Sequence, residues 1–167
     1  MKYLFLLILF CLQGSNLFAS NRSEDYVAQV DSLLKINNIA DIELICNSIA
    51  DSDSVARNHK MEVELVKLAI DYMQPEALLL FYESKIGQYD AAVDSITPIE
   101  YFFDDNFEKR ISDQLSCGGD QQEVSQKIFF TFHILLAFQP INDKIVELTS
   151  LRLLTLADIW SRKKCIE

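Results

Sequence analysis

The chain has 167 residues, 50% of them hydrophobic, and its formal net charge at pH 7 is −10. A chain of this length can bury one hydrophobic core, so we expect a single domain. An acidic surface repels nucleic acid and anionic lipid and attracts cations, which excludes the first two as partners and favours a basic protein.

The N-terminus has the pattern of an export signal. Lys2 is the only charged residue of the first 20, an unbroken apolar run covers 3–12, and small and polar residues follow. The run is about half the length that a membrane span requires. We therefore expect 1–20 to be a cleaved signal peptide and 21–167 to be one helical domain, periplasmic or secreted, with no membrane span. Cleavage removes Lys2 and leaves 14 basic against 25 acidic residues, a net charge of −11.

The rest of the chain is predicted to be helical, because glycine and proline stand at segment edges and no stretch alternates apolar and polar residues as a strand would. Helix-capping residues precede most segments, and Thr97 with Glu100 has the spacing of a capping box. The pattern indicates an all-α domain of about seven helices in a compact bundle. The predicted helices are 24–36, one capped by Asp41, one from the 51–54 turn to about Met73, one from Pro75 to about Gly87, then 98–116, 121–139 and 143–164, with a short helix or turn at 88–96.

The last two predicted helices are joined by only a few residues and should form an antiparallel hairpin. Its fold-back point lies near residue 141, midway between Cys117 and Cys165, so these cysteines face each other at the open end. Export supplies the oxidising compartment that a bridge needs. We predict a disulfide between Cys117 and Cys165, which would close a loop of about 49 residues and stabilise the fold by about 4 kcal/mol.

The third cysteine of the mature chain, Cys46, lies in an apolar stripe at helical spacing with Ile42, Ile45 and Ile49. Such a stripe faces the core, where a free thiol behaves as a small hydrophobic side chain. We expect Cys46 to be a free buried thiol. The alternative is a reactive or intermolecular thiol.

The two histidines are the candidates for catalysis or metal binding. His133 lies in the most apolar internal stretch, 128–138, so it is expected to be a core histidine bonded to a neighbouring helix. His59 stands three residues before Glu62, with which it could share a ligand or a proton. Metal sites gather three or four ligands, and no Glu-x-x-His pattern, nucleophile turn, phosphate loop or Cys-x-x-Cys pair occurs. We expect neither a metal nor a cofactor.

The segment YFFDDNFE at 101–108 is the candidate binding surface. On a helix that begins at Pro98, one face combines a tyrosine with three carboxylates. These residues, at positions i, i+3, i+4 and i+7, are Tyr101, Asp104, Asp105 and Glu108. The tyrosine would anchor a cationic partner and the carboxylates would steer it. The alternative is an ordinary solvated face.

Residues 81–98 carry Gly87, Tyr89, Ala92 and Pro98 and resemble the turn and second helix of a tetratricopeptide repeat. The resemblance covers under a quarter of the chain and implies helix–turn–helix geometry there. No second copy follows at the period of about 34 residues, and repeat arrays need about three copies. The chain is therefore not assigned to that family.

These patterns favour an exported acidic helical protein that binds a cationic protein partner, as an inhibitor or an immunity-type protein would. One alternative is a helical-repeat-like scaffold or adaptor, which predicts a concave groove. Another is a metal-dependent or hydrolytic enzyme using His59 or His133, which predicts a polar pocket that gathers a histidine with carboxylates. The sequence leaves the oligomeric state open.

Overall fold

The computed structural model describes residues 24–51, 58–116, 120–139 and 142–163. Within them the regular elements are all helices, and no strand is formed, which confirms the all-α class. In chain order they are a helix at 24–35, α2 (Ile39–Ala50), α3 (His59–Asp71), α4 (Pro75–Glu83), α5 (Pro98–Phe102), α6 (Phe107–Ser116), α7 (Gln121–Phe138) and α8 (Asp143–Lys163). The predicted signal peptide and the predicted Cys117–Cys165 bridge lie outside the described residues.

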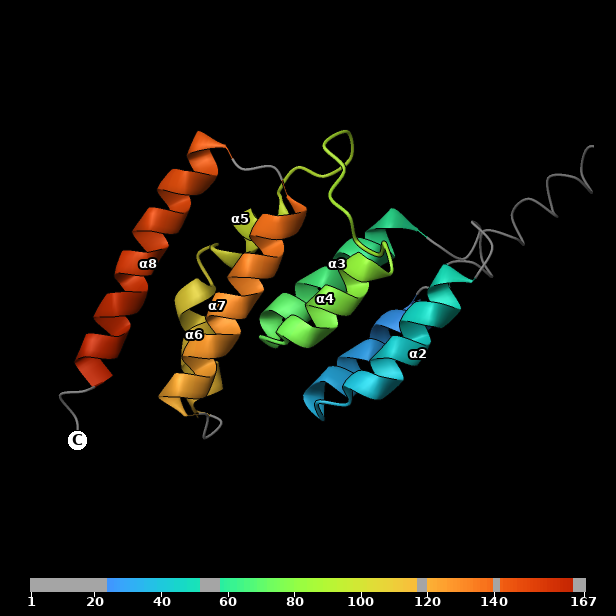
Figure 1. The fold of residues 1–167 in the computed structure, drawn as a ribbon, viewed down its shortest axis with the longest axis horizontal. Coiled ribbons are helices and arrows are strands. Elements are labelled where there is room, and N and C mark those ends of the chain that lie inside the picture. The colour runs from blue at the N-terminus through green and yellow to red at the C-terminus, as the bar shows by residue number, and fades with distance from the viewer. Residues whose placement is uncertain (1–23, 52–57, 117–119, 140–141, 164–167) are drawn as a thin grey trace, which may run out of the picture.

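The helices lie side by side in a row (Figure 1), with the 24–35 helix and α2 at one end and α8 at the other. Near the middle of the row, α4 contacts α2, α3 and α7. Its buried side chains are Pro75, Ala77, Leu78, Phe81 and Tyr82. Toward the other end, α5 contacts α3, α7 and α8. The core therefore runs through α4 and α5.

Polar caps set where several helices begin. The Thr97 side chain accepts a hydrogen bond from the Glu100 N–H, and the Glu100 carboxylate accepts one from the Thr97 N–H, which confirms the predicted capping box. The Asp120 side chain caps α7 by accepting from the Gln122 N–H at 3.3 Å. The prediction that Asp41 caps the second helix is wrong, because Asn38 occupies that position and accepts from the Asp41 N–H.

The predicted continuous helix at 98–116 is interrupted after its first turn. An Asp104 carboxylate oxygen accepts from the Asn106 N–H at 2.8 Å, and a local bond of this kind competes with the helical ladder. The interruption lets aromatic residues on both sides of the turn reach the core together. Phe102, Phe103 and Phe107 pack edge to face, with ring centroids 4.7–5.5 Å apart.

The stretch between α4 and α5 forms turns and bends, so the second helix implied by the tetratricopeptide resemblance is absent from these described residues. The chain leaves α4 with Lys85 in the left-handed region, at φ 58°, and the Ile86 N–H bonds the Phe81 carbonyl. Gly87 follows at φ 68° and passes close to α3. A Cβ at this position would lie 2.3 Å from Val66 Cγ2 and 2.7 Å from the Glu62 carbonyl oxygen.

The last two helices, α7 and α8, run in opposite directions (Figure 1), as the predicted hairpin requires, but α8 packs more on α5 than on α7. The apolar stretch 128–138 predicts a central helix that is buried on all sides. This prediction is wrong, because one face of α7 is exposed. The side of α7 toward its neighbours buries Val124, Ile128, Thr131 and Leu135. Phe129 and Phe130, on the other side, are more than half exposed.

Candidate binding surface

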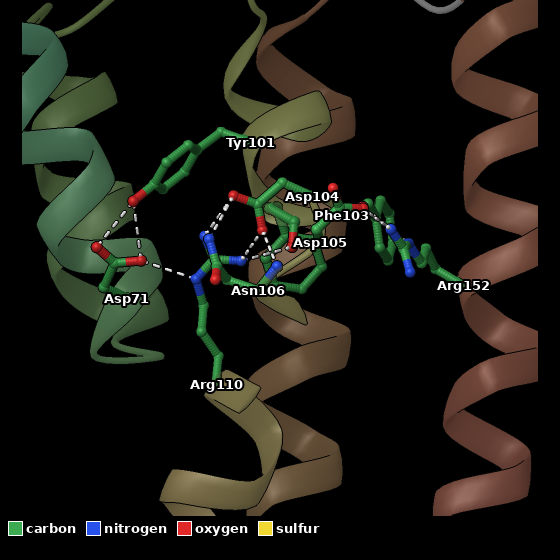
Figure 2. Close-up of polar contacts among 9 residues, drawn as sticks. Asp71, Tyr101, Phe103, Asp104, Asp105, Asn106, Arg110 and Arg152 are labelled. Atoms are coloured by element: carbon green, nitrogen blue, oxygen red, sulfur yellow. Dashed lines mark hydrogen bonds and ion pairs between the residues drawn. The ribbon is translucent and has the colours of Figure 1, made fainter. Parts of the chain in front are cut away.

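A buried arginine organises the turn between α5 and α6. The Arg110 side chain comes from α6, is 7% exposed, and reaches back over the turn (Figure 2). Its Nε donates to Asp71 Oδ1 at 2.7 Å, while Nη1 and Nη2 donate to the two Asp104 carboxylate oxygens at 2.9 and 3.2 Å. Nη1 also donates to the Phe102 carbonyl at 3.2 Å. The planar guanidinium thus ties three chain segments together.

The ionisation of Arg110 is fixed by these contacts. Burial on its own lowers the pKa of an arginine, because it disfavours the charged form. Hydrogen bonds to Asp104 and Asp71 outweigh burial here and raise the pKa of Arg110 above its ordinary value. The group is therefore a permanent cation within the fold.

Tyr101 belongs to the same network. Its hydroxyl donates to both Asp71 carboxylate oxygens, at 3.0 and 2.9 Å. Lys67 Nζ lies 5.1 Å and Arg110 Cζ 4.7 Å from the centre of the ring, within range of cation–π attraction. Burial raises the pKa of Tyr101, and the hydrogen bond to Asp71 raises it further. The hydroxyl thus stays protonated as the donor to Asp71.

The interruption divides the four predicted binding residues into two pairs. Tyr101 and Asp104 are partly buried and held by the Arg110 network. Asp105 and Glu108 are exposed. The four side chains were placed on one face by assuming a continuous helix, and the turn after α5 removes that register.

Asp105 and the turn also connect to α8. Arg152 Nη2 lies 3.3 Å from Asp105 Oδ1, and Arg152 Nε donates to the Phe103 carbonyl at 2.9 Å (Figure 2). An ion pair between Lys144 and Glu100 adds a second link between α8 and α5. The turn therefore supports the exposed carboxylates and also holds the last helix.

A separate acidic pocket, not found from the sequence, lies between the 24–35 helix and α3. It has a volume of about 550 Å³ and an apolar lining that includes Val27 and Leu68. Its charged lining residues are Glu24, Asp31, Lys60 and Glu64. Contacts between residues some 35 positions apart build this pocket, so no local sequence pattern could have indicated it.

His59, at the start of α3, lies 2.7 Å through Nε2 from Asp94 Oδ1. The other Asp94 oxygen accepts from the Asp90 N–H at 2.8 Å, which fixes the carboxylate. The pair borders a surface pocket of about 480 Å³ that is also lined by Glu64 and Lys67. A histidine with two carboxylates is the composition that the enzyme alternative predicts. Asp94, distant in sequence, was missed as a partner of His59.

His133 is not a core histidine, so that prediction is wrong. The side chain is exposed, and its Nδ1 donates to the Phe129 carbonyl of the same helix at 2.9 Å. The ring also packs on the Phe129 ring, with centroids 4.0 Å apart. His133 lies on the face of α7 that no other described helix covers.

Cys46 is fully buried in α2, between Ile42 and Ile49. Burial raises the pKa of its thiol to about 11. At neutral pH the thiolate, which is the nucleophile, is therefore scarce.

In the part of the chain that the structure describes, no group of three or more potential metal-ligating side chains occurs. No described helix is long and apolar enough to cross a bilayer.

The described residues form an all-helical fold in which Arg110 holds an acidic turn between α5 and α6. Comparisons with protein-family models, curated proteins and solved structures find no match to this chain. Its function is therefore argued from its own residues.

Proposed function

We propose that this protein is an exported acidic binding protein whose partner is a cationic protein, and that it acts as an inhibitor or immunity-type protein. The observation that carries the proposal is the α5–α6 turn. There the buried Arg110 fixes a segment that presents Asp105 and Glu108 to solvent. Carboxylates held by a rigid support lose little freedom when a partner binds, which favours affinity.

In this proposal the four residues have different roles. Asp105 and Glu108 contact the partner, while Asp104 and Tyr101 hold the turn through Arg110. The net charge of −11 expected for the cleaved chain, with 14 basic and 25 acidic residues, adds long-range attraction for a cationic protein and speeds its encounter.

The proposal predicts that binding depends on salt and on this turn. The partner is first captured from the exported fraction at low ionic strength. The affinity of this protein for that partner should fall at least about tenfold between 20 and 200 mM salt, since screening weakens the attraction between exposed charges. The double variant Asp105→Asn/Glu108→Gln should lose about tenfold at low salt, as expected for two rim charges. Titration calorimetry measures both effects.

The matched control is Glu24→Gln/Glu64→Gln, which removes the same charge from the acidic pocket beside α3. Its affinity should fall less than that of the turn variant. If the control loses more, the partner docks in the pocket and the assignment of the turn is wrong. Affinity that does not change with salt contradicts a cationic partner altogether.

Export and the bridge between Cys117 and Cys165 are parts of the same proposal. They predict that the mature protein exposes one thiol per chain, that of Cys46, and only after unfolding. Thiol titration should find no rapid reaction in the native state, because burial raises the Cys46 pKa to about 11. Three reactive thiols in urea without reductant would rule out the bridge. The mass of the secreted chain tests removal of 1–20.

A hydrolytic enzyme using His59 is the second candidate, favoured by the fixed His59–Asp94 pair at its pocket. In that role Asp94 would orient the imidazole and His59 would act as general base. The variant His59→Gln distinguishes the two candidate functions. It should abolish a hydrolytic activity of that pocket and leave partner binding at the α5–α6 turn unchanged. The scaffold alternative has less support, because the second helix of the repeat-like segment is not formed.

A further inference from the structure

The outer face of α8 is apolar. Ile145 and Leu156 are buried, and Arg152 on the same side contacts the α5–α6 turn. The other side of the helix exposes four large aliphatic side chains, with Leu154 at 72%. These are Val146, Leu151, Leu153 and Leu154. Because α8 lies at the edge of the row of helices (Figure 1), no described helix covers this face.

Charge is divided unevenly along the chain. Residues 1–120 contain 20 acidic and 9 basic residues, a net charge of −11, whereas 121–167 contain 5 acidic and 6 basic residues, a net charge of +1. Two copies of so acidic a protein repel each other over most of their surface. Repulsion is weakest where the C-terminal segment is presented, and α8 is its outermost helix.

The charges of α8 are also ordered along the helix. Asp143, Lys144 and Glu147 lie in its first two turns, a net charge of −1, and Lys144 is paired with Glu100 of α5. Toward the other end, the sequence places Asp158 before Arg162 and Lys163, a net charge of +1. Two such helices in parallel would bring like charges together at both ends. In an antiparallel pair, the acidic start of each helix meets the basic end of the other, and the helix dipoles are also opposed favourably.

We propose that the protein forms a homodimer in which the outer faces of two α8 helices pack antiparallel about a two-fold axis near Leu153 and Leu154. The occupant of the apolar face is thus a second copy of this chain, in an isologous contact. A cationic partner is drawn to the acidic part of the chain, and anionic lipid is repelled by it, so neither fits this face as well. This inference is independent of the proposed binding at the α5–α6 turn.

The test is sedimentation velocity on the full native protein across a range of concentrations. The wild type should dimerise, and Leu154→Glu should raise the dimer dissociation constant about 100-fold or more, since the change is made twice in a symmetric contact. The matched control, Leu44→Glu, places the same charge at an exposed leucine of α2 and should leave the dimer unchanged. Circular dichroism checks that both variants fold.

A second variant tests orientation. Glu147→Lys should weaken the antiparallel dimer about tenfold, because the new lysine meets a basic helix end. A monomer at all concentrations up to about 100 µM, a dimer that survives Leu154→Glu, or a dimer strengthened by Glu147→Lys would each overturn the proposal. Binding of a monomeric chain to anionic vesicles that is lost in Leu154→Glu would also overturn it, in favour of a lipid surface.

Discussion

Replacing Arg110 with methionine is expected to lower the free energy of unfolding by about 2–3 kcal/mol, because it leaves Asp71 and Asp104 close together without their shared cation. Methionine keeps much of the apolar length of the side chain, so the loss comes from charge and hydrogen bonds. Both carboxylates retain some contact with water, which places the effect below that of breaking a fully buried pair. Urea denaturation measures the difference.

Lys109→Met is the matched control, since it removes a neighbouring but exposed cation, and it should change stability by less than about 0.5 kcal/mol. Adding Asp104→Asn to Arg110→Met should recover part of the loss, because the amide removes the repulsion with Asp71. If Arg110→Met lowered the free energy of unfolding as little as Lys109→Met does, the network would contribute nothing to stability.

Gly87→Ala is expected to cost about 2–4 kcal/mol. The residue adopts φ 68°, where a side chain is disfavoured, and the added Cβ would lie 2.3 Å from Val66 Cγ2 and 2.7 Å from the Glu62 carbonyl oxygen. A side chain can shift, but a main-chain carbonyl within α3 cannot move without disturbing the helix. Thermal unfolding would report the loss as a lower midpoint.

The double variant Gly87→Ala/Val66→Ala separates the two sources of strain. Removing the Val66 methyl groups should relieve the side-chain clash but not the clash with the Glu62 carbonyl, so the two changes should couple only in part. Gln88→Ala, at the next and exposed position, is the control and should have little effect. A native-like midpoint for Gly87→Ala would contradict the close approach of this turn to α3.

The helical class followed from the sequence because it depends on local chemistry. Periodic apolar residues and caps such as Thr97 with Glu100 act within one turn of helix, and these are present where predicted. The interruption at Asp104 also had a local signal. The run Asp104-Asp105-Asn106 places three residues whose side chains compete for backbone N–H groups inside a predicted helix. The absence of glycine and proline from the interior of the segment outweighed that signal.

The network around Arg110 could not be predicted in the same way. Arg110 and Asp71 are 39 residues apart, and neither position carries a pattern that announces the other. Tyr101 illustrates the result: its spacing from Asp104 suggested an exposed recognition face, whereas its hydroxyl is turned to Asp71. Packing between α3 and the α5–α6 turn decides which polar groups remain available, and this depends on tertiary structure.

The prediction that the 128–138 stretch is buried on all sides was wrong for a related reason. The stretch 128–138 is apolar on all sides, so periodicity gives no indication of which side meets the other helices. The packing of α7 against α4, α5 and α6 decides this, and it leaves Phe129 and His133 exposed. Composition alone therefore overstated the burial of His133.

The attachment of α8 gives the irregular stretch after α5 a further importance. Arg152 bonds a main-chain oxygen there, that of Phe103, so no substitution at that residue deletes the acceptor. A change in backbone path would delete it, because a regular helix through 98–116 would engage the same oxygen in its own ladder. Mutations that straighten this segment, although locally favourable, should thus release the C-terminal helix from its main-chain anchor at Phe103.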